Sequence, residues 1–188
     1  MNRIFISFCL LFCLLCSSSF ALEKLTHERL NEVIAPQINQ SLVALGFPQG
    51  VEAFVNGEKI IRWIKDGGIK EDEPVYSRSL NHFHNPLKTW DIAGFKGTFQ
   101  LSVIWAQDQG AFGSLWGGDF SWKKDREYFY TALTGKDFSG NMIAPTQSEK
   151  GKYFANTFRG IGQVMHLVED ASVPAHTRDD SNKGASHV

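Results

Sequence analysis

The chain has 188 residues, of which 43% are apolar and 21% are charged, and its formal net charge is −1. This length and composition fit one globular domain, and the 13% of aromatic residues excludes a disordered chain. The near-neutral charge gives no broad electrostatic attraction to nucleic acid or anionic membranes.

Residues 1–21 have the pattern of a secretory signal peptide. The basic residue Arg3 precedes an apolar run over residues 4–16 and a small, polar stretch that ends at Ala21. The apolar run is too short to span a bilayer comfortably, although an uncleaved anchor is the alternative. Cleavage would start the mature chain at Leu22, so we expect a secreted or periplasmic protein.

The three cysteines, Cys9, Cys13 and Cys16, all lie in this leader. The mature chain would therefore contain neither a disulfide nor a thiolate ligand. We expect residues 22–188 to form one domain that is long enough to be stabilised by burial of apolar surface, and a bound metal ion would add to its stability.

Two apolar patterns with helical spacing follow the leader. The first covers residues 26–45, in which Pro36 predicts a kink or a break. The second covers residues 51–65, and we expect Gly67 and Gly68 to end that helix.

The middle of the chain has weaker patterns. Residues 69–87 have loop character, residues 99–107 fit a helix or a strand, and the glycine-rich, aromatic residues 105–122 are predicted to form a loop. Residues 123–133 are expected to be helical and to be followed by a polar loop. Because strand signals are scarce throughout, the domain is predicted to be all-α with long loops.

Residues 149–171 give the clearest helical pattern. Gly160 and Gly162 leave room for another backbone to approach this helix closely. Its apolar stripe, which we expect to face the core, consists of Phe154, Phe158, Ile161, Met165 and Val168.

The polar side of this helix carries a candidate metal site. His166 and Asp170 are four residues apart, so they lie on one helical face and can bind the same ion. Pro174 is expected to end the helix, and His176 follows on the turn. Imidazole and carboxylate ligands without sulfur suit zinc. For His166 and Asp170 alone, the alternative is a solvated polar pair.

The segment HLVEDASVPAH resembles the ligand helix of the zinc-dependent phospholipase C and single-strand-specific nuclease superfamily. These mostly α-helical enzymes carry three zinc ions and hydrolyse phosphate esters. Their ligand helix has a His, an Asp four residues later and a second His six residues after that, and His166, Asp170 and His176 match this spacing. The resemblance implies a multi-helix domain of the phospholipase C and nuclease type over residues 22–188.

Two more segments resemble the same family. NHFHNP is similar to a bacterial phospholipase segment in which an aromatic residue and a proline follow a ligand His, and this alignment selects His82 rather than His84. The acidic stretch before it implies Asp72 as ligand or catalytic base, with Glu71 as the alternative. THERLNEVIA resembles the family's first helix, whose ligand is His27.

The resemblance also implies ligands near both ends of the mature chain. The family uses backbone atoms of its first mature residue, normally a Trp; Leu22 has the spacing from His27 found in the nuclease branch, but not the residue type. The last family motif is a His followed four residues later by an acid, and His187 is placed to begin it. Because the sequence stops at Val188, we expect it to be truncated; the alternative is an incomplete zinc site.

The full set of metal ligands implied by the resemblance is Leu22, His27, Asp72, His82, His166, Asp170, His176 and His187. In this scheme Asp170 bridges two ions, one held with His82 and His166 and the other with His27. Asp72 would orient or deprotonate the attacking water.

The implied activity is that of an exported phosphoric-ester hydrolase with three zinc ions, most similar to phospholipase C. Its substrate would be a phospholipid or another phosphodiester, with transient membrane contact through residues 105–122. The nuclease branch is the alternative, because aromatic side chains can stack on single-stranded bases. A zinc-stabilised binding module without catalysis and a metal-free helical protein are alternatives from other classes.

Overall fold

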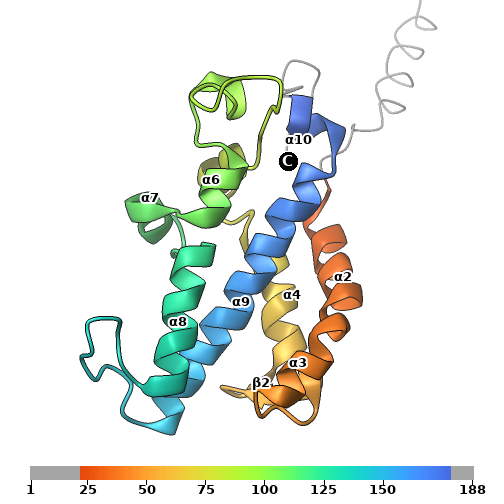
Figure 1. The fold of residues 1–188 in the computed structure, drawn as a ribbon. Coiled ribbons are helices and arrows are strands. Elements are labelled where there is room, and N and C mark those ends of the chain that lie inside the picture. The colour runs from red at the N-terminus through yellow and green to blue at the C-terminus, as the bar shows by residue number, and fades with distance from the viewer. Residues whose placement is uncertain (1–21, 179–188) are drawn as a thin grey trace, which may run out of the picture.

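The longest helix, α9 (Gln147–Ala171), is the axis of the fold (Figure 1). Helix α4 (Ile60–Lys70) packs along one side of α9 and α8 (Trp122–Thr134) along the other, while α2 (Lys24–Ile34) packs against α4. This mostly helical architecture confirms the predicted all-α class. The computed structural model describes residues 22–178, so the predicted signal peptide and His187 lie outside the described residues.

Short elements connect these four helices. They are η1 (Ala35–Ile38), α3 (Asn39–Ala44), η2 (Gly50–Glu52), β1 (Phe54–Val55), β2 (Glu58–Lys59), α5 (Val75–Arg78), η3 (Ser79–Asn81), η4 (Phe95–Gly97), α6 (Ser102–Gln107), α7 (Gly110–Leu115) and α10 (Pro174–Arg178). The two strands pair antiparallel as a hairpin, with Phe54 opposite Lys59. Between residues 22 and 178, no helix has the length and apolar character that a membrane span requires.

Local capping explains why the two best-predicted helices begin and end where they do. Thr146 and Glu149 form a reciprocal capping box at the start of α9. Ser121 accepts a hydrogen bond from the backbone of Lys124 at the start of α8. Gly135 ends α8 in a left-handed conformation with φ of 79°. The predictions of helices over residues 149–171 and 123–133 are confirmed within two residues.

The predicted helices before residue 70 are partly wrong. Pro36 does break the first pattern, which becomes α2, η1 and α3. The expected helix over residues 51–65 instead contains η2 and the β1–β2 hairpin, because Asn56 and Gly57 adopt positive φ values that suit a tight turn. Gly67 and Gly68 do not end a helix but lie inside α4.

The middle and the end of the chain are more helical than predicted. Residues 99–107, left open between helix and strand, contain α6, and the expected loop over residues 105–122 contains α7. Two short helices, α5 and η3, replace part of the expected loop over residues 69–87. Pro174 follows α9 but also begins α10, where its fixed φ is compatible with a first helical turn, so that His176 lies in a helix.

The apolar core surrounds the first half of α9. Ile60 and Ile64 of α4 are fully buried in one cluster with Phe158 and with residues of η2 and the hairpin. Four residues of the predicted α9 stripe pack in or against this core, but Val168 is 66% exposed, so the prediction is wrong there. In the last turns of α9 the buried side is polar instead, with Gln163, His166, Glu169 and Asp170.

Helices α4 and α9 cross at glycines. A Cβ atom on Gly67 would collide with the carbonyl oxygen of Arg159, and one on Gly162 would collide with that of Ile64. The expected close approach of a second backbone is therefore confirmed at Gly162. At Gly160 the space is filled instead by the buried carboxyl of Asp125 from α8.

A buried amide joins three helices at this crossing. Asn31 of α2 is fully buried, and its Nδ2 donates to the carbonyl oxygens of Ile64 at 3.0 Å and Gly162 at 3.2 Å. Both carbonyl groups belong to the glycine crossing. Helix α2 is thereby held to α4 and α9 at one point.

The glycine crossing predicts opposite effects for two Gly→Ala substitutions in α9. Gly162→Ala should lower the free energy of unfolding by about 2 kcal/mol or more, because backbone atoms of α4 must move. Gly151→Ala, where the nearest atom would be 3.8 Å away, should raise it by about 0.5–1 kcal/mol through helix propensity. Urea unfolding measures both values, and equal stabilities would contradict the proposed packing role.

Candidate metal centre

Six buried histidine and aspartate side chains converge at the C-terminal end of α9. They form three overlapping groups, in each of which three potential ligand atoms lie within 4.8 Å of one another. The six residues are His27, Asp72, His82, His166, Asp170 and His176. All six were predicted as ligands from the sequence, and they come from regions up to 149 positions apart (176 − 27).

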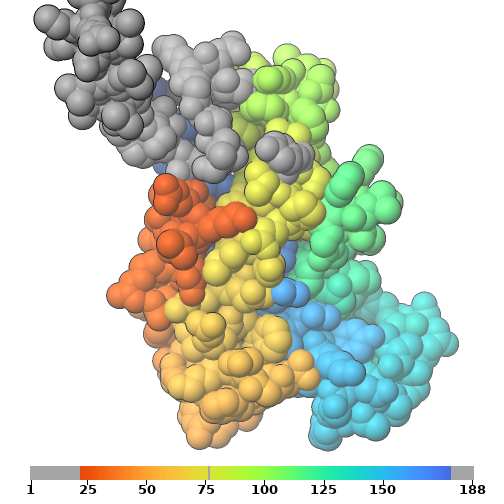
Figure 2. Space-filling view, turned by 180° about the vertical axis from the view of Figure 1, so that it is seen from behind, coloured from red at the N-terminus to blue at the C-terminus, as the bar shows by residue number. Residues whose placement is uncertain are grey.

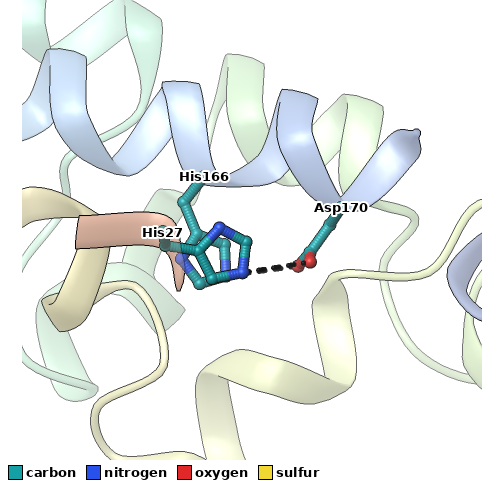
Figure 3. Close-up of side chains that lie close together, drawn as sticks. All are labelled: His27, His166 and Asp170. Atoms are coloured by element: carbon teal, nitrogen blue, oxygen red, sulfur yellow. Dashed lines mark ion pairs between the residues drawn. The ribbon is translucent and has the colours of Figure 1, made fainter. Parts of the chain in front are cut away.

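Several elements supply these side chains. His27 lies in the first turn of α2, and His166 and Asp170 lie one turn apart on α9, as Figure 3 shows. Asp72 follows the end of α4, and His82 directly follows η3. His176 comes from α10, so the turn after α9 brings it back towards the same centre.

Asp170 lies at the centre of the cluster. Its Oδ1 is 3.4 Å from Nε2 of His27. Its Oδ2 is 2.8 Å from Nδ1 of His82, 3.2 Å from Nε2 of His166 and 3.5 Å from Nδ1 of His176. The two oxygens thus face different histidines, which is the arrangement required of a carboxylate that bridges two ions.

Hydrogen bonds behind two of the rings fix which nitrogen faces the centre. Nδ1 of His27 lies 2.6 Å from Oε2 of Glu169, and Nδ1 of His166 lies 2.6 Å from the carbonyl oxygen of Gly68. Because a carbonyl oxygen can only accept, Nδ1 of His166 is the donor and its Nε2 is left to bind in the neutral ring. Such outer partners commonly orient metal-binding histidines.

The atoms that point into the cluster lack hydrogen bonds. Within the described residues, Nε2 of His27, Nε2 of His166, both ring nitrogens of His82 and both oxygens of Asp170 are buried without one. Buried polar groups normally have partners, so this convergence fits a metal site. The ligands are nitrogen and oxygen atoms, and residues 22–178 contain no cysteine. This set of donor atoms is compatible with zinc.

Charge within the cluster is balanced by protons when metal is absent. Burial disfavours protonated His27 and His82, but the nearby carboxylates outweigh it. Asp170 and Glu169 raise the pKa of His27 to about 9. Asp170, together with Glu71 and Asp72, raises the pKa of His82 to about 10. Burial opposes ionisation of Asp170 too, yet the surrounding histidines hold its pKa well below the usual range.

Asp72 is the most accessible member of the cluster. Its side chain is 10% exposed, compared with 1% or less for its neighbours His82 and His166. Its Oδ1 lies 3.7 Å from Nδ1 of His82 and 3.9 Å from Nε2 of His166. It therefore stands at the solvent-facing rim of the cluster.

Glu71, the sequence alternative to Asp72, has other partners. It is fully buried, and its Oε2 accepts from Arg78 at 2.6 Å while its Oε1 accepts from Trp105 at 2.6 Å. Its Oε1 is also 3.7 Å from Nε2 of His82. Glu71 thus lies behind His82 and supports the segment that carries it.

Three other histidine or backbone positions considered in the sequence are not members of the cluster of six side chains. The ring of His84 contacts Trp90 and is not part of the metal-ligand groups of the described chain, as the alignment to His82 predicted. Leu22 is the first described residue, and its role as a backbone ligand stays a prediction. His187 lies outside the described residues.

Sequence reasoning missed the residues behind the ligands. Glu169 contacts His27 across 142 positions of sequence, and no local pattern marks such a pair. Arg78 is buried and also donates to Gln109 and Gln163, so it links the Glu71 segment to α9. The only sequence signal for Arg78 was its position between the candidate ligands Asp72 and His82.

Comparisons with protein-family models, curated proteins and solved structures found no significant match.

Zinc uptake at pH 7 should release about two protons, because the ligands must be neutral imidazoles and raised pKa values keep His27 and His82 protonated in the metal-free protein. Zinc affinity should accordingly rise with pH up to the range of about 9 to 10. Calorimetric titration in buffers of different ionisation enthalpy counts the released protons. His84→Gln, outside the cluster, should release the same number, whereas heats independent of the buffer would contradict this charge state.

Proposed function

We propose that the protein is an exported, zinc-dependent hydrolase of phosphoric esters that resembles phospholipase C and binds three zinc ions. The observation that supports this proposal most strongly is the overlap of the three candidate ligand groups around Asp170. A single ion needs only one such group, whereas a carboxylate with two oxygens that is shared between groups suits ions held close together.

The assignment of residues to ions follows the three groups. His27, His166 and Asp170 form one group, and His82, Asp170 and His176 form another. Asp72 forms the third with His82 and His166, which therefore each belong to two groups. Because only Nε2 of His166 is left to bind, His166 can serve one of its two groups: the ion of His82, as the sequence scheme expects, or the ion of His27. We assign His187 and the Leu22 backbone as the remaining ligands.

The chemistry needs a positive site for an anionic ester and a base for water. Bound zinc would neutralise the phosphoryl charge and lower the pKa of a water molecule. Asp72, at the rim, is placed to orient that water and accept its proton. Glu169 and the Gly68 carbonyl keep His27 and His166 in their binding orientations. Asp170 keeps its negative charge and holds the histidines around it.

We favour a phospholipid substrate, with transient contact between the protein and a membrane surface. Large apolar side chains are exposed, notably Trp90 at 59% and Phe112 at 64%. The net charge of −1 gives little attraction to nucleic acid. For this reason we rank single-stranded nucleic acid second. It stays a candidate because the spacing of Leu22 and His27 matches the nuclease branch.

Purified protein should contain about three zinc ions per chain and should hydrolyse a phosphocholine ester, and chelation should abolish this activity. Metal analysis and release of phosphocholine measure the two quantities. Rapid cleavage of single-stranded DNA with no action on lipid would assign the protein to the nuclease alternative. Retention of zinc without turnover of either substrate would identify a binding module, and absence of zinc at neutral pH would refute the proposal.

Asp170→Asn tests the bridging carboxylate. The variant should lose more than one zinc ion per chain, because Asp170 serves two ligand groups. Its activity should fall about 100-fold or more. Asp91→Asn changes an exposed aspartate and serves as the matched control. Metal content measured alongside circular dichroism separates loss of ions from loss of fold. An unchanged metal content in folded Asp170→Asn would exclude the bridging role.

A further inference from the structure

A cavity of about 510 Å³ lies beside the metal centre and has no role in the assignments above. One wall comes from the segment between two candidate ligands, Asp72 and His82, and includes Pro74 and Asn81. The other wall comes from residues 98–116. Figure 2 shows these two segments, in yellow and green, next to each other on the face seen from behind.

A chain of side-chain contacts links the lining of the cavity to the metal centre. Trp105 is 1% exposed, lines the cavity and donates its Nε1–H to Oε1 of Glu71 at 2.6 Å. The same Oε1 lies 3.7 Å from Nε2 of His82. Asn81, on the facing wall, is the residue immediately before His82. Along this path two side chains, those of Trp105 and Glu71, separate a molecule in the cavity from His82.

The lining defines what the cavity can bind. Three aromatic residues besides Trp105 line it and stay 41–64% exposed, namely Phe99, Phe112 and Trp116. Among the described residues that line the cavity, none carries a charge. An aromatic, uncharged wall favours an apolar group and gives no ion pair to a phosphate backbone. The volume lies in the usual range for small-molecule sites.

We propose that this cavity binds the acylated, uncharged side of the phosphoester while the phosphate lies at the metal centre. The inference rests on the proposed function for the position of the phosphate, but the affinity of the cavity for an acyl group does not depend on catalysis. Three features support acyl chains: four aromatic side chains in the lining, no basic residue among the described lining residues, and a wall formed by the segment between Asp72 and His82.

Direct binding tests the cavity without catalysis. Dihexanoylglycerol, which lacks a phosphate, is titrated into the purified protein with zinc bound and after chelation. Phe112→Ala and, as a second variant, Phe99→Ala should each weaken its binding about tenfold, because each loses one apolar contact. Leu115→Ala is the matched control, since Leu115 lies on the same helix as Phe112 and is 72% exposed but does not line the cavity.

Equal affinity in Phe112→Ala, Phe99→Ala and Leu115→Ala would overturn the proposal. Tighter binding of deoxyadenosine than of dihexanoylglycerol, with loss in Phe112→Ala, would also overturn it and indicate a base-binding site.

Kinetics separate this inference from the proposed function. In the wild type, kcat/KM should rise from dibutanoyl- to dihexanoylphosphatidylcholine, and Phe112→Ala should flatten that rise while Leu115→Ala retains it. A wild type that binds dihexanoylglycerol through Phe112 but hydrolyses no phosphoester would refute the proposed function and uphold the cavity. Hydrolysis with the same chain-length dependence in all variants would uphold the function and refute the cavity.

Discussion

A buried negative charge at Asp170 is the constraint on which the rest of this structure depends. Its side chain is 1% exposed, and burial of a carboxylate without compensation is strongly unfavourable. Four imidazoles surround it, and in the absence of metal two of them carry protons with raised pKa values. The same positions can be filled by metal cations instead. Protons and metal ions thus compete for one set of lone pairs, and either one makes the burial of Asp170 tolerable.

Helix α9 has an apolar first half and a polar second half, and the polar half is the one that surrounds the buried charge of Asp170. Around Phe158 the helix is held by apolar burial against α4 and the hairpin, which gives stability without specific geometry. Around His166 it is held by polar groups whose directions matter, including Gly68 behind one ring and Glu169 behind another. The apolar half contains no buried group that needs a cation, whereas the buried atoms of the polar half need either protons or metal ions as partners.

The sequence was most informative where function and local pattern coincide. The spacing of His166, Asp170 and His176 predicted their convergence, because a helix of known period places residues four apart on one face. His27, Asp72 and His82 were found by resemblance, since no periodicity connects such distant positions. The contact of Glu169 with His27 depends on how α2 packs on α9, which the sequence does not encode locally.

Errors in the predicted fold have an equally local cause. Gly67 and Gly68 were interpreted as a helix end, which is the usual role of glycine pairs. In the structure Gly67 lets the backbones of α4 and α9 meet, and Gly68 leaves room for Asn31 of α2. The hairpin before α4 was missed because its alternating apolar residues also fit a helical spacing, and only the Asn56–Gly57 turn separates the two.

The buried amide of Asn31 has a consequence for how the metal centre assembles. It ties α2 to both α4 and α9 one turn away from His27, so the segments that supply His27, the Gly68 carbonyl and His166 form a stiff wall. The opposite side of the centre is built from short elements, which carry Asp72, His82 and His176. The centre is therefore bounded on one side by three helices joined at a single buried amide and on the other side by short segments.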